Sequence, residues 1–366
     1  MDFDGTFRYV LSGLGYLIIL MSLVPLLRSN WWFVRIFDYP RSQKFWLNLM
    51  ILLIYVVVIG WNEVSDLVFI AAMSLNLAYL FSKVWEYTKL APVQMKVNGK
   101  EGDSIRLLVA NVFQDNRDAS GLLRMIDTSD PDLVLLVETD DWWVTQMRSR
   151  YDEYSHRVEI PKSNTYGMLL LSRLEIADYK IRYIVEDDIP SIQADIITPS
   201  WQTFRLYGLH PKPPVPQESG ESTERDAEIL IVAKECTTCQ LPVIVAGDLN
   251  DVAWSFTTNL FLKVSGLLDP RIGRGFFSTF HAKYRLMRWP LDHVFCSSHF
   301  YLHVLKRMGD IGSDHFPILI EVGLEPYDIP ENAKEEKVAD PEEIEIATEK
   351  IASAKFDRVS DKQRKS

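Results

Sequence analysis

Three long apolar runs near the N-terminus constrain the fold of this chain more than any other feature. They cover about residues 7–27, 45–61 and 64–84, and ionisable side chains are almost absent from them. A membrane-spanning helix needs about 20 apolar residues, with a range of roughly 17–25. A signal peptide would have a basic start and one short run, whereas this chain begins MDFDGTF. We therefore expect a transmembrane anchor of three helices over residues 1–90; a buried helical bundle is the alternative.

The charges that flank the runs predict an orientation. The loop at 28–44 has one acidic residue, Asp38, against four basic ones: Arg28, Arg35, Arg41 and Lys44. Lysines also follow the third run, whereas the N-terminus and the turn NEVSD are acidic. Loops with excess lysine and arginine stay in the cytoplasm. We expect an integral protein of a bacterial inner membrane with everything after residue 85 in the cytoplasm, and losing one span would reverse this orientation.

From residue 104 the pattern changes to apolar runs that alternate with helix-like segments. The runs are continuous, which is typical of strands buried on both faces. They include IRLLVANV (105–112), LVLLVE (133–138), FRLYGLH (204–210) and VIVAGD (243–248). Helical spacing appears over 117–130 and after Ser222. This succession predicts sheets covered by helices, in an α/β domain at 104–325 that follows a linker at 91–103.

The C-terminal segment has a different composition. Residues 326–366 are highly charged, and from Pro330 onward Phe356 is the only aromatic residue. Such a segment cannot bury enough apolar surface to fold as a domain. We expect a disordered tail at 326–366, with a solvated helix over 341–356 as the alternative.

Polar side chains stand at the ends of most of the apolar runs. They are Asn111, Glu138, His210, Asp248, Asn250, Asp292, His293, Asp314 and His315. The carboxyl ends of buried strands meet at one edge of a sheet, where α/β proteins place their sites. Clustered carboxylates need a cation or donors, and oxygen ligands select Mg²⁺, Mn²⁺ or Ca²⁺ rather than zinc; we expect Mg²⁺, with Mn²⁺ as a substitute. With histidine and amide donors, such a site suits attack on a phosphate ester.

The motifs at these positions resemble the endonuclease/exonuclease/phosphatase superfamily, which has the fold of deoxyribonuclease I. In chain order they are LLVAN, DLVLLVE, YGMLLLSR, LYGLH, GDLN, LDHVF and SDH, and they lie within residues 104–322. The resemblance implies an α/β fold, a two-sheet sandwich flanked by helices, preceded here by the all-α transmembrane segment. It also implies a metal-dependent hydrolase that acts on phosphate esters.

The resemblance further implies a role for each matching residue. Glu138 would be the main metal ligand, with Asn111 beside it and Asp314 as a second ligand or a nearby charge. Asp248 would orient or deprotonate the attacking water, and Asn250 would hold a phosphoryl oxygen. Judged on its residues alone, the segment Gly-Asp-Leu-Asn also suits a plain tight turn.

Three further residues acquire roles in the same way. His210 would donate a hydrogen bond to the phosphate, and His315 would stabilise the transition state or assist the leaving group. Asp292 would fix the tautomer of His315, as a carboxylate does for a catalytic imidazole. His293 is expected to be structural.

The segment at 271–288 is basic, although the net charge of the chain is −11. Its basic residues are Arg271, Arg274, Lys283, Arg285 and Arg288. Because the segment leads directly to Asp292, we expect it to rim the site and contact substrate phosphates; a solvated loop is the alternative. The acidic balance argues against a long nonspecific contact with DNA.

The leading functional hypothesis is a membrane-anchored, Mg²⁺-dependent phosphoesterase that hydrolyses phosphodiester bonds. Its partners would be the lipid bilayer and a substrate drawn from nucleic acids or lipid headgroups, and no protein partner is predicted. The alternatives are a hydrolase of phospholipid or sphingolipid headgroups, a phosphomonoesterase, and an inactive binding or sensor module. Every expected catalytic position is occupied, which disfavours the inactive module. The near absence of ionisable residues from the runs disfavours a channel or transporter.

Overall fold

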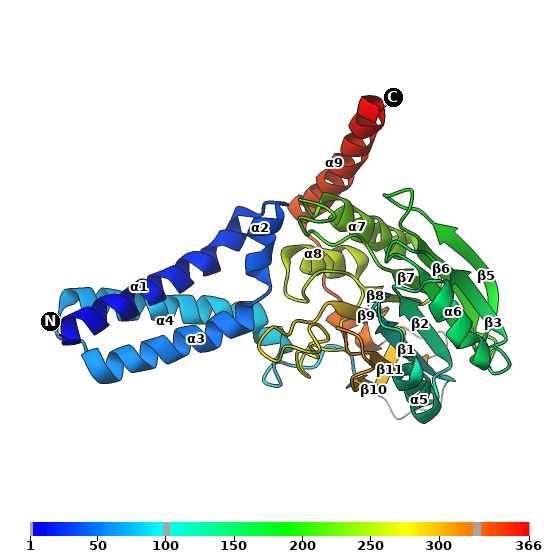
Figure 1. Cartoon of the computed structure of the whole chain (residues 1–366), viewed down its shortest axis with the longest axis horizontal. Coiled ribbons are helices and arrows are strands. Elements are labelled where there is room, and N and C mark those ends of the chain that lie inside the picture. Colours follow the sequence, from blue (N-terminus) through cyan, green and yellow to red (C-terminus); the bar gives the residue numbers. More distant parts are fainter. Residues whose placement is uncertain (1–2, 98–102, 325–330, 366) are drawn as a thin grey trace.

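The computed structural model describes residues 3–97, 103–324 and 331–365. Three long helices project from one side of a sandwich of sheets and helices (Figure 1). Residues 98–102 of the expected linker lie outside the described residues.

The projecting helices correspond to the three apolar runs. Helices long and apolar enough to cross a membrane extend over Gly5–Leu27, Arg41–Ile59 and Val64–Tyr87. Only 22%, 22% and 28% of their most apolar windows are buried, so most of these side chains face outward. The elements are α1 (Phe3–Leu23), η1 (Val24–Leu27), α2 (Trp32–Arg35), η2 (Ile36–Asp38), α3 (Arg41–Ile54), η3 (Tyr55–Ile59), α4 (Val64–Val84) and η4 (Trp85–Tyr87).

Polar side chains join the three helices inside their bundle. Asn76 Nδ2 donates to Asn48 Oδ1 at 2.9 Å and to Ser22 Oγ at 3.4 Å. Asn48 Nδ2 in turn donates to the Met73 carbonyl at 3.0 Å. In lipid the hydrophobic effect does not drive apolar helices together. Buried hydrogen bonds of this kind therefore help to fix the arrangement of such helices.

The domain contains two mixed sheets. One has six strands in the order β10-β11-β1-β2-β4-β3, and the other has five in the order β5-β6-β7-β8-β9. The strands are β1 (Asp103–Asn111), β2 (Leu133–Val137), β3 (His156–Ile160), β4 (Met168–Ser172), β5 (Glu175–Arg182), β6 (Ser191–Ile197), β7 (Thr203–Leu209), β8 (Val243–Asp248), β9 (Asp292–Cys296), β10 (Phe300–Arg307) and β11 (Ile318–Leu324).

The sheets pack face to face and helices cover their outer faces. Leu107 and Leu135 of the first sheet share one core with Leu206 and Ile244 of the second, and all four are fully buried. Helices α5 (Ser120–Ser129) and α6 (Asp141–Met147) cover the first sheet, and α7 (Thr223–Thr238) and α8 (Phe256–Ser265) cover the second. The two-sheet sandwich flanked by helices is therefore confirmed.

Strand direction brings the polar ends of both sheets together at one end of the sandwich. β1 runs parallel to β2, and β7 runs parallel to β8. β11 and β9 run antiparallel to β1 and β8, so these strands begin where their neighbours end. In the β8–β9 ladder Asp248 lies directly opposite Asp292.

The C-terminal segment differs from the expected disordered tail. Residues Pro341–Lys365 form helix α9, preceded by a short 3-10 helix at Glu331–Glu335. Ala347 packs in a buried cluster with residues of α7 and α8, and Ala354 is buried beside α7. The observed helix includes the 341–356 segment of the alternative expectation, but it is docked rather than solvated, because a helix can pack through a narrow stripe of small residues. Residues 325–330 and 366 lie outside the described residues.

A buried charge cluster joins the loop after α1, the domain and α9. We define it as Arg35, Asp38, Arg225, Asp226, Asp251 and Lys350. Arg35 Nη2 donates to Asp251 Oδ2 at 3.4 Å, and Lys350 Nζ donates to Asp226 Oδ2 at 2.9 Å. Burial would raise the pKa of Asp226, but the charges of Lys350, Arg225 and Arg35 outweigh it and hold that pKa below its ordinary value. Buried carboxylates persist only with such partners.

An apolar contact completes the junction between the helices and the domain. Val84 and Tyr87 pack with Val252, Ala253 and Trp254, which follow strand β8. The Tyr87 hydroxyl donates to the Ala253 carbonyl at 2.7 Å. The apolar helices are therefore packed against the domain rather than tethered to it.

We predict that Arg35→Met destabilises the protein. Asp251 and Asp226 would each lose a buried cation, a change that typically costs about 3–5 kcal/mol. The measurement is thermal unfolding of the full chain in detergent, with Arg124→Met at an exposed position as the control. Equal unfolding temperatures for the two variants would contradict a structural role for Arg35.

Candidate active site

The turn after β8 has a backbone that few residues can adopt. Gly247 has φ +139°, and a Cβ there would lie 1.9 Å from the Leu209 carbonyl oxygen of β7. Only glycine lets the two strands approach so closely. Asn250 has φ 51°, in the left-handed region that non-glycine residues seldom occupy. The Asn250 N–H donates to Asp248 Oδ1 at 2.9 Å, so the turn itself orients the Asp248 carboxylate.

His315 lies between two buried carboxylates. Its Nδ1 is 2.7 Å from Asp292 Oδ2, and its Nε2 is 3.5 Å from Asp248 Oδ2. All three residues are at most 4% exposed. The expected pairing of Asp292 with His315 is therefore present in the structure.

The surroundings of His315 and Asp248 set their protonation. Burial would lower the pKa of His315, but the charges of Asp292 and Asp248 outweigh it and raise that pKa to about 10. Burial raises the pKa of Asp248 to about 7, although the charge of His315 opposes the shift. At neutral pH His315 is thus an imidazolium whose Nδ1–H donates to Asp292. Oδ1 of Asp292 is buried without a hydrogen-bond partner among the described residues.

His210 has the opposite protonation state. Burial is the main cause that lowers its pKa to about 3, so its imidazole is neutral at pH 7. Its ring lies 5.5 Å from the Tyr166 ring, and its Nδ1 is buried without a partner in the described part of the chain. The charges of His315 and Asp292 act on it, which places His210 beside the same cluster.

Glu138 and Asn111 form the other side of the site. Asn111 Nδ2 donates to Glu138 Oε1 at 2.7 Å and to Asp248 Oδ2 at 3.1 Å. Asn111 Oδ1 accepts from the Phe113 N–H at 2.9 Å. The amide of Asn111 thus bridges two carboxylates as a donor, and its expected place beside a metal stays a prediction. Glu138, at φ 64°, has a pKa raised by burial, and the charge of Asp314 adds to the increase.

The donor set fits a divalent cation. Four carboxylates, Glu138, Asp248, Asp292 and Asp314, share the site with one imidazolium, and this excess of negative charge favours an oxygen-bound cation. Asp248, Asp292 and His315 offer ligand atoms within 4.8 Å of one another. Within this group His315 Nδ1 is engaged in its hydrogen bond to Asp292.

The basic residues of the segment 271–288 do not all lie at the surface. Arg271 was expected to rim the site, and this expectation is wrong. Arg271 is 2% exposed and binds Asp269 through Nη2 at 2.7 Å. The same nitrogen lies 2.7 Å from His293 Nδ1, and His293 Nε2 lies 2.8 Å from the Asp251 carbonyl. Arg271 therefore supports the interior of the loop instead of rimming the site, because Asp269 supplies its counter-charge. The expected structural role of His293 agrees with these contacts.

The other basic residues lie nearer the surface. Arg274 and Arg288 line an open groove of about 620 Å³ together with Lys306 and Arg307, and no acidic residue among those that the structure describes lines it. The Lys283 ammonium lies 5.6 Å from the Phe113 ring, two residues beyond Asn111. Arg285 is exposed.

Sequence reasoning missed two residues that hold the turn after β8. The Tyr39 hydroxyl and Arg225 Nη1 both donate to the Asn250 carbonyl, at 3.0 and 2.6 Å. Tyr39 is 211 positions from Asn250, so no local pattern could connect them. Arg225 and Asp226 lie in the first turn of α7, a helix that contains other charged residues, so its sequence did not single them out. Asn250 Nδ2 donates to the Pro211 carbonyl at 3.0 Å and retains a second hydrogen.

Comparisons with solved structures agree with this fold. TDP2 of D. rerio, in complex with a single-strand DNA product, is 18% identical with a TM-score of 0.50, covering 60% of this chain and 99% of that one. A family protein of Bacteroides thetaiotaomicron is 14% identical with a TM-score of 0.50, covering 62% and 100%. The human nocturnin catalytic domain with bound sulfate is 17% identical with a TM-score of 0.49, covering 61% and 94%.

A search of curated proteins found no match. A sequence profile of the Endonuclease/Exonuclease/phosphatase family matches residues 108–315, more than half of the chain. This stretch begins in β1 and ends at His315, so it includes the whole set of polar side chains at the sheet edge. The chain belongs to the endonuclease/exonuclease/phosphatase family, whose domain implies a hydrolase of phosphate esters.

Proposed function

We propose that this chain is a membrane-anchored, Mg²⁺-dependent phosphodiesterase. The observation that carries the proposal is the buried array Asp248–His315–Asp292, with distances of 3.5 and 2.7 Å between its members. It supplies a carboxylate with a pKa of about 7 next to a protonated imidazole, the pair that hydrolysis of a phosphate ester needs.

Each side chain has a defined task in this reaction. Asp248 takes a proton from the attacking water, because a pKa of about 7 leaves a basic fraction at neutral pH. His315 donates from Nε2 to the leaving oxygen, while Asp292 keeps the ring oriented. The neutral His210 and the second amide hydrogen of Asn250 bind phosphoryl oxygens.

A divalent ion fits beside these groups. Glu138, with Asp314 nearby, would hold Mg²⁺ or Mn²⁺, and when bound the ion would withdraw negative charge from the phosphate. The side chains named above orient the ester and move its protons.

The substrate class favoured by the surface is a nucleic acid. The groove lined by Arg274, Arg288, Lys306 and Arg307 has four cations and, in the described part of the chain, no carboxylate, which suits a substrate with several phosphates. A phospholipid or sphingolipid headgroup is the second candidate, because the apolar helices would hold the domain beside a bilayer. A phosphomonoester has no comparable observation in its favour.

We expect Glu138→Gln to weaken metal binding. Loss of a ligand carboxylate should lower the affinity for Mn²⁺ by about 10–100-fold or more, since even changes to groups behind the ligands have effects of that size. Mn²⁺ binding to the full chain is read by electron paramagnetic resonance, which does not depend on turnover. Glu175→Gln, at an exposed position on β5, is the matched control. Equal affinities in the two variants would remove Glu138 from the metal site.

Nicking of supercoiled plasmid by the full chain in detergent tests the activity. We expect nicking with Mg²⁺, none with EDTA, and a loss of about 10²–10⁴-fold in Asp248→Asn. Lys306→Gln should reduce nicking while leaving a small chromogenic diester unaffected, with Lys180→Gln on the distant β5 as its control. Intact plasmid beside cleaved lipid headgroups would select the second candidate. Activity unchanged in EDTA would refute the metal-dependent mechanism.

The helices and flanking charges support membrane anchoring with the domain in the cytoplasm. We expect the chain to remain in membranes of a bacterial host after an alkaline carbonate wash. Green fluorescent protein fused after Ser366 should fluoresce, and alkaline phosphatase fused there should be inactive. The reverse pattern would place the domain on the other side, and release by carbonate would refute anchoring.

A further inference from the structure

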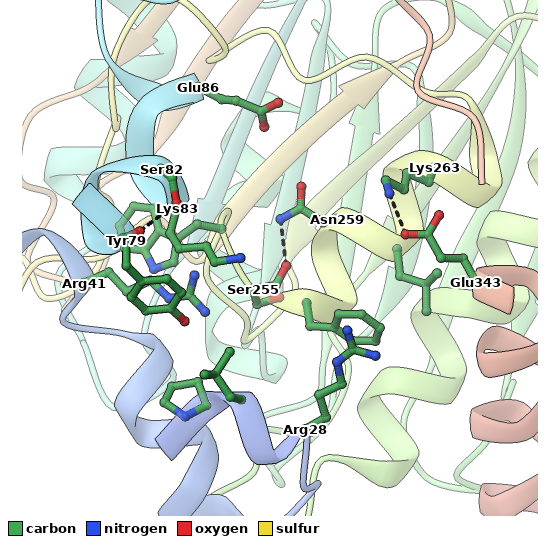
Figure 2. Close-up of a pocket in the computed structure, with 15 residues that line it drawn as sticks. Arg28, Arg41, Tyr79, Ser82, Lys83, Glu86, Ser255, Asn259, Lys263 and Glu343 are labelled. Atoms are coloured by element: carbon green, nitrogen blue, oxygen red, sulfur yellow. Dashed lines mark hydrogen bonds and ion pairs between the residues drawn. The ribbon is translucent and has the colours of Figure 1, made fainter. Parts of the chain in front are cut away.

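A second polar cavity lies at the junction of the apolar helices and the domain. It has a volume of about 400 Å³ and lies between the domain-side ends of α1 and α4 and the first turns of α8. Figure 2 shows Arg28, Arg41 and Lys83 reaching into it, with Ser255 and Asn259 opposite. No residue of the catalytic array lines this cavity, so it is a separate site.

Two cations in the cavity have no acidic partner. Arg41 is paired with Asp38, and Lys263 is paired with Glu343. Among the residues that the structure describes, neither Lys83 nor Arg28 forms an ion pair. The Lys83 ammonium lies 5.5 Å from the Tyr79 ring, and the Arg28 guanidinium lies 4.7 Å from the Phe256 ring. The cavity therefore has two positive charges available for an anion.

The position of the cavity along the apolar helices indicates the source of that anion. Its walls include Pro25 and Leu26 at the end of the first apolar helix, and Tyr79 and Ser82 near the end of the third. If these helices span a bilayer, this level coincides with the lipid headgroups. Leu26 is 56% exposed at the rim, where an acyl chain would leave the headgroup. Basic pockets between membrane helices bind anionic headgroups.

We propose that this cavity binds the phosphate of an anionic phospholipid, held by Lys83 and Arg28. Lys83 and Arg28 supply the charge. The amide nitrogen of Asn259 donates one hydrogen to the Ser255 carbonyl at 2.9 Å and has a second hydrogen for a phosphate oxygen. The proposal rests on the proposed membrane anchoring and does not depend on catalysis. The bound lipid would fill the space between the apolar helices and α8, the helix that follows the catalytic turn.

Native mass spectrometry of the full chain in neutral detergent tests the proposal. The probes are phosphatidylglycerol and phosphatidylcholine with the same acyl chains. We expect a preference for phosphatidylglycerol that falls roughly 25-fold in the double variant Lys83→Gln with Arg28→Gln, since each basic group contributes about fivefold. The control pair, Lys89→Gln with Arg148→Gln, removes two exposed charges outside the cavity and should retain the preference.

Several outcomes would overturn the proposal. One is equal binding of the two lipids by the unmodified chain; another is an equal loss of preference in the control pair. Displacement of the lipid by millimolar glycerol phosphate would assign the cavity to a soluble phosphate instead.

Lys83→Arg, which keeps the charge, should retain the preference, and unfolding temperatures show that each variant is folded. Failure of the anchoring itself would appear separately, as protein that stays in solution after detergent is removed.

Discussion

The buried pairing of Arg35 with Asp251 is the contact on which the rest of the arrangement depends. Asp251 follows Asn250 in the catalytic turn, and Arg35 belongs to the loop between the first two apolar helices. Tyr39 of the same loop donates to the Asn250 carbonyl. The conformation of the turn, with Asn250 in a left-handed backbone, is thus held from one side by the N-terminal segment and from the other by Arg225. The apolar helices are part of the structure that forms the site.

The site contains two histidines with opposite protonation, His210 after β7 of one sheet and His315 before β11 of the other. Burial is the largest effect on the pKa of His210, and the charge of Asp292 does not outweigh it, so the imidazole stays neutral. His315 is equally buried but lies between Asp292 and Asp248, whose charges keep it protonated. A proton donor and a neutral hydrogen-bonding group therefore coexist at neutral pH. The antiparallel register of β8 and β9, which sets Asp248 opposite Asp292, makes this possible.

Much of the fold and of the candidate site could be predicted from the sequence, for a physical reason. Strands buried on both faces leave continuous apolar runs, and polar residues at the ends of those runs meet because parallel strands end together. Strands β3, β5 and β10 lack a continuous apolar run. For example, β5 is exposed along nearly its whole length. Arg271 was misplaced because sequence does not reveal that Asp269 neutralises it. The contacts of Tyr39, Arg225 and Lys350 join segments far apart in the chain, so only the folded structure reveals them.

The opposite roles of Asp248 and His315 are tested most directly by the dependence of turnover on the leaving group. Methyl phosphodiesters with leaving groups from nitrophenol to simple alcohols would be hydrolysed by the full chain and by His315→Gln. If His315 protonates the leaving oxygen, the variant should lose little on the nitrophenyl ester and progressively more as the leaving group becomes more basic. Asp248→Asn should lose a similar factor on every ester. A uniform loss in His315→Gln would contradict the assignment of His315 as the proton donor.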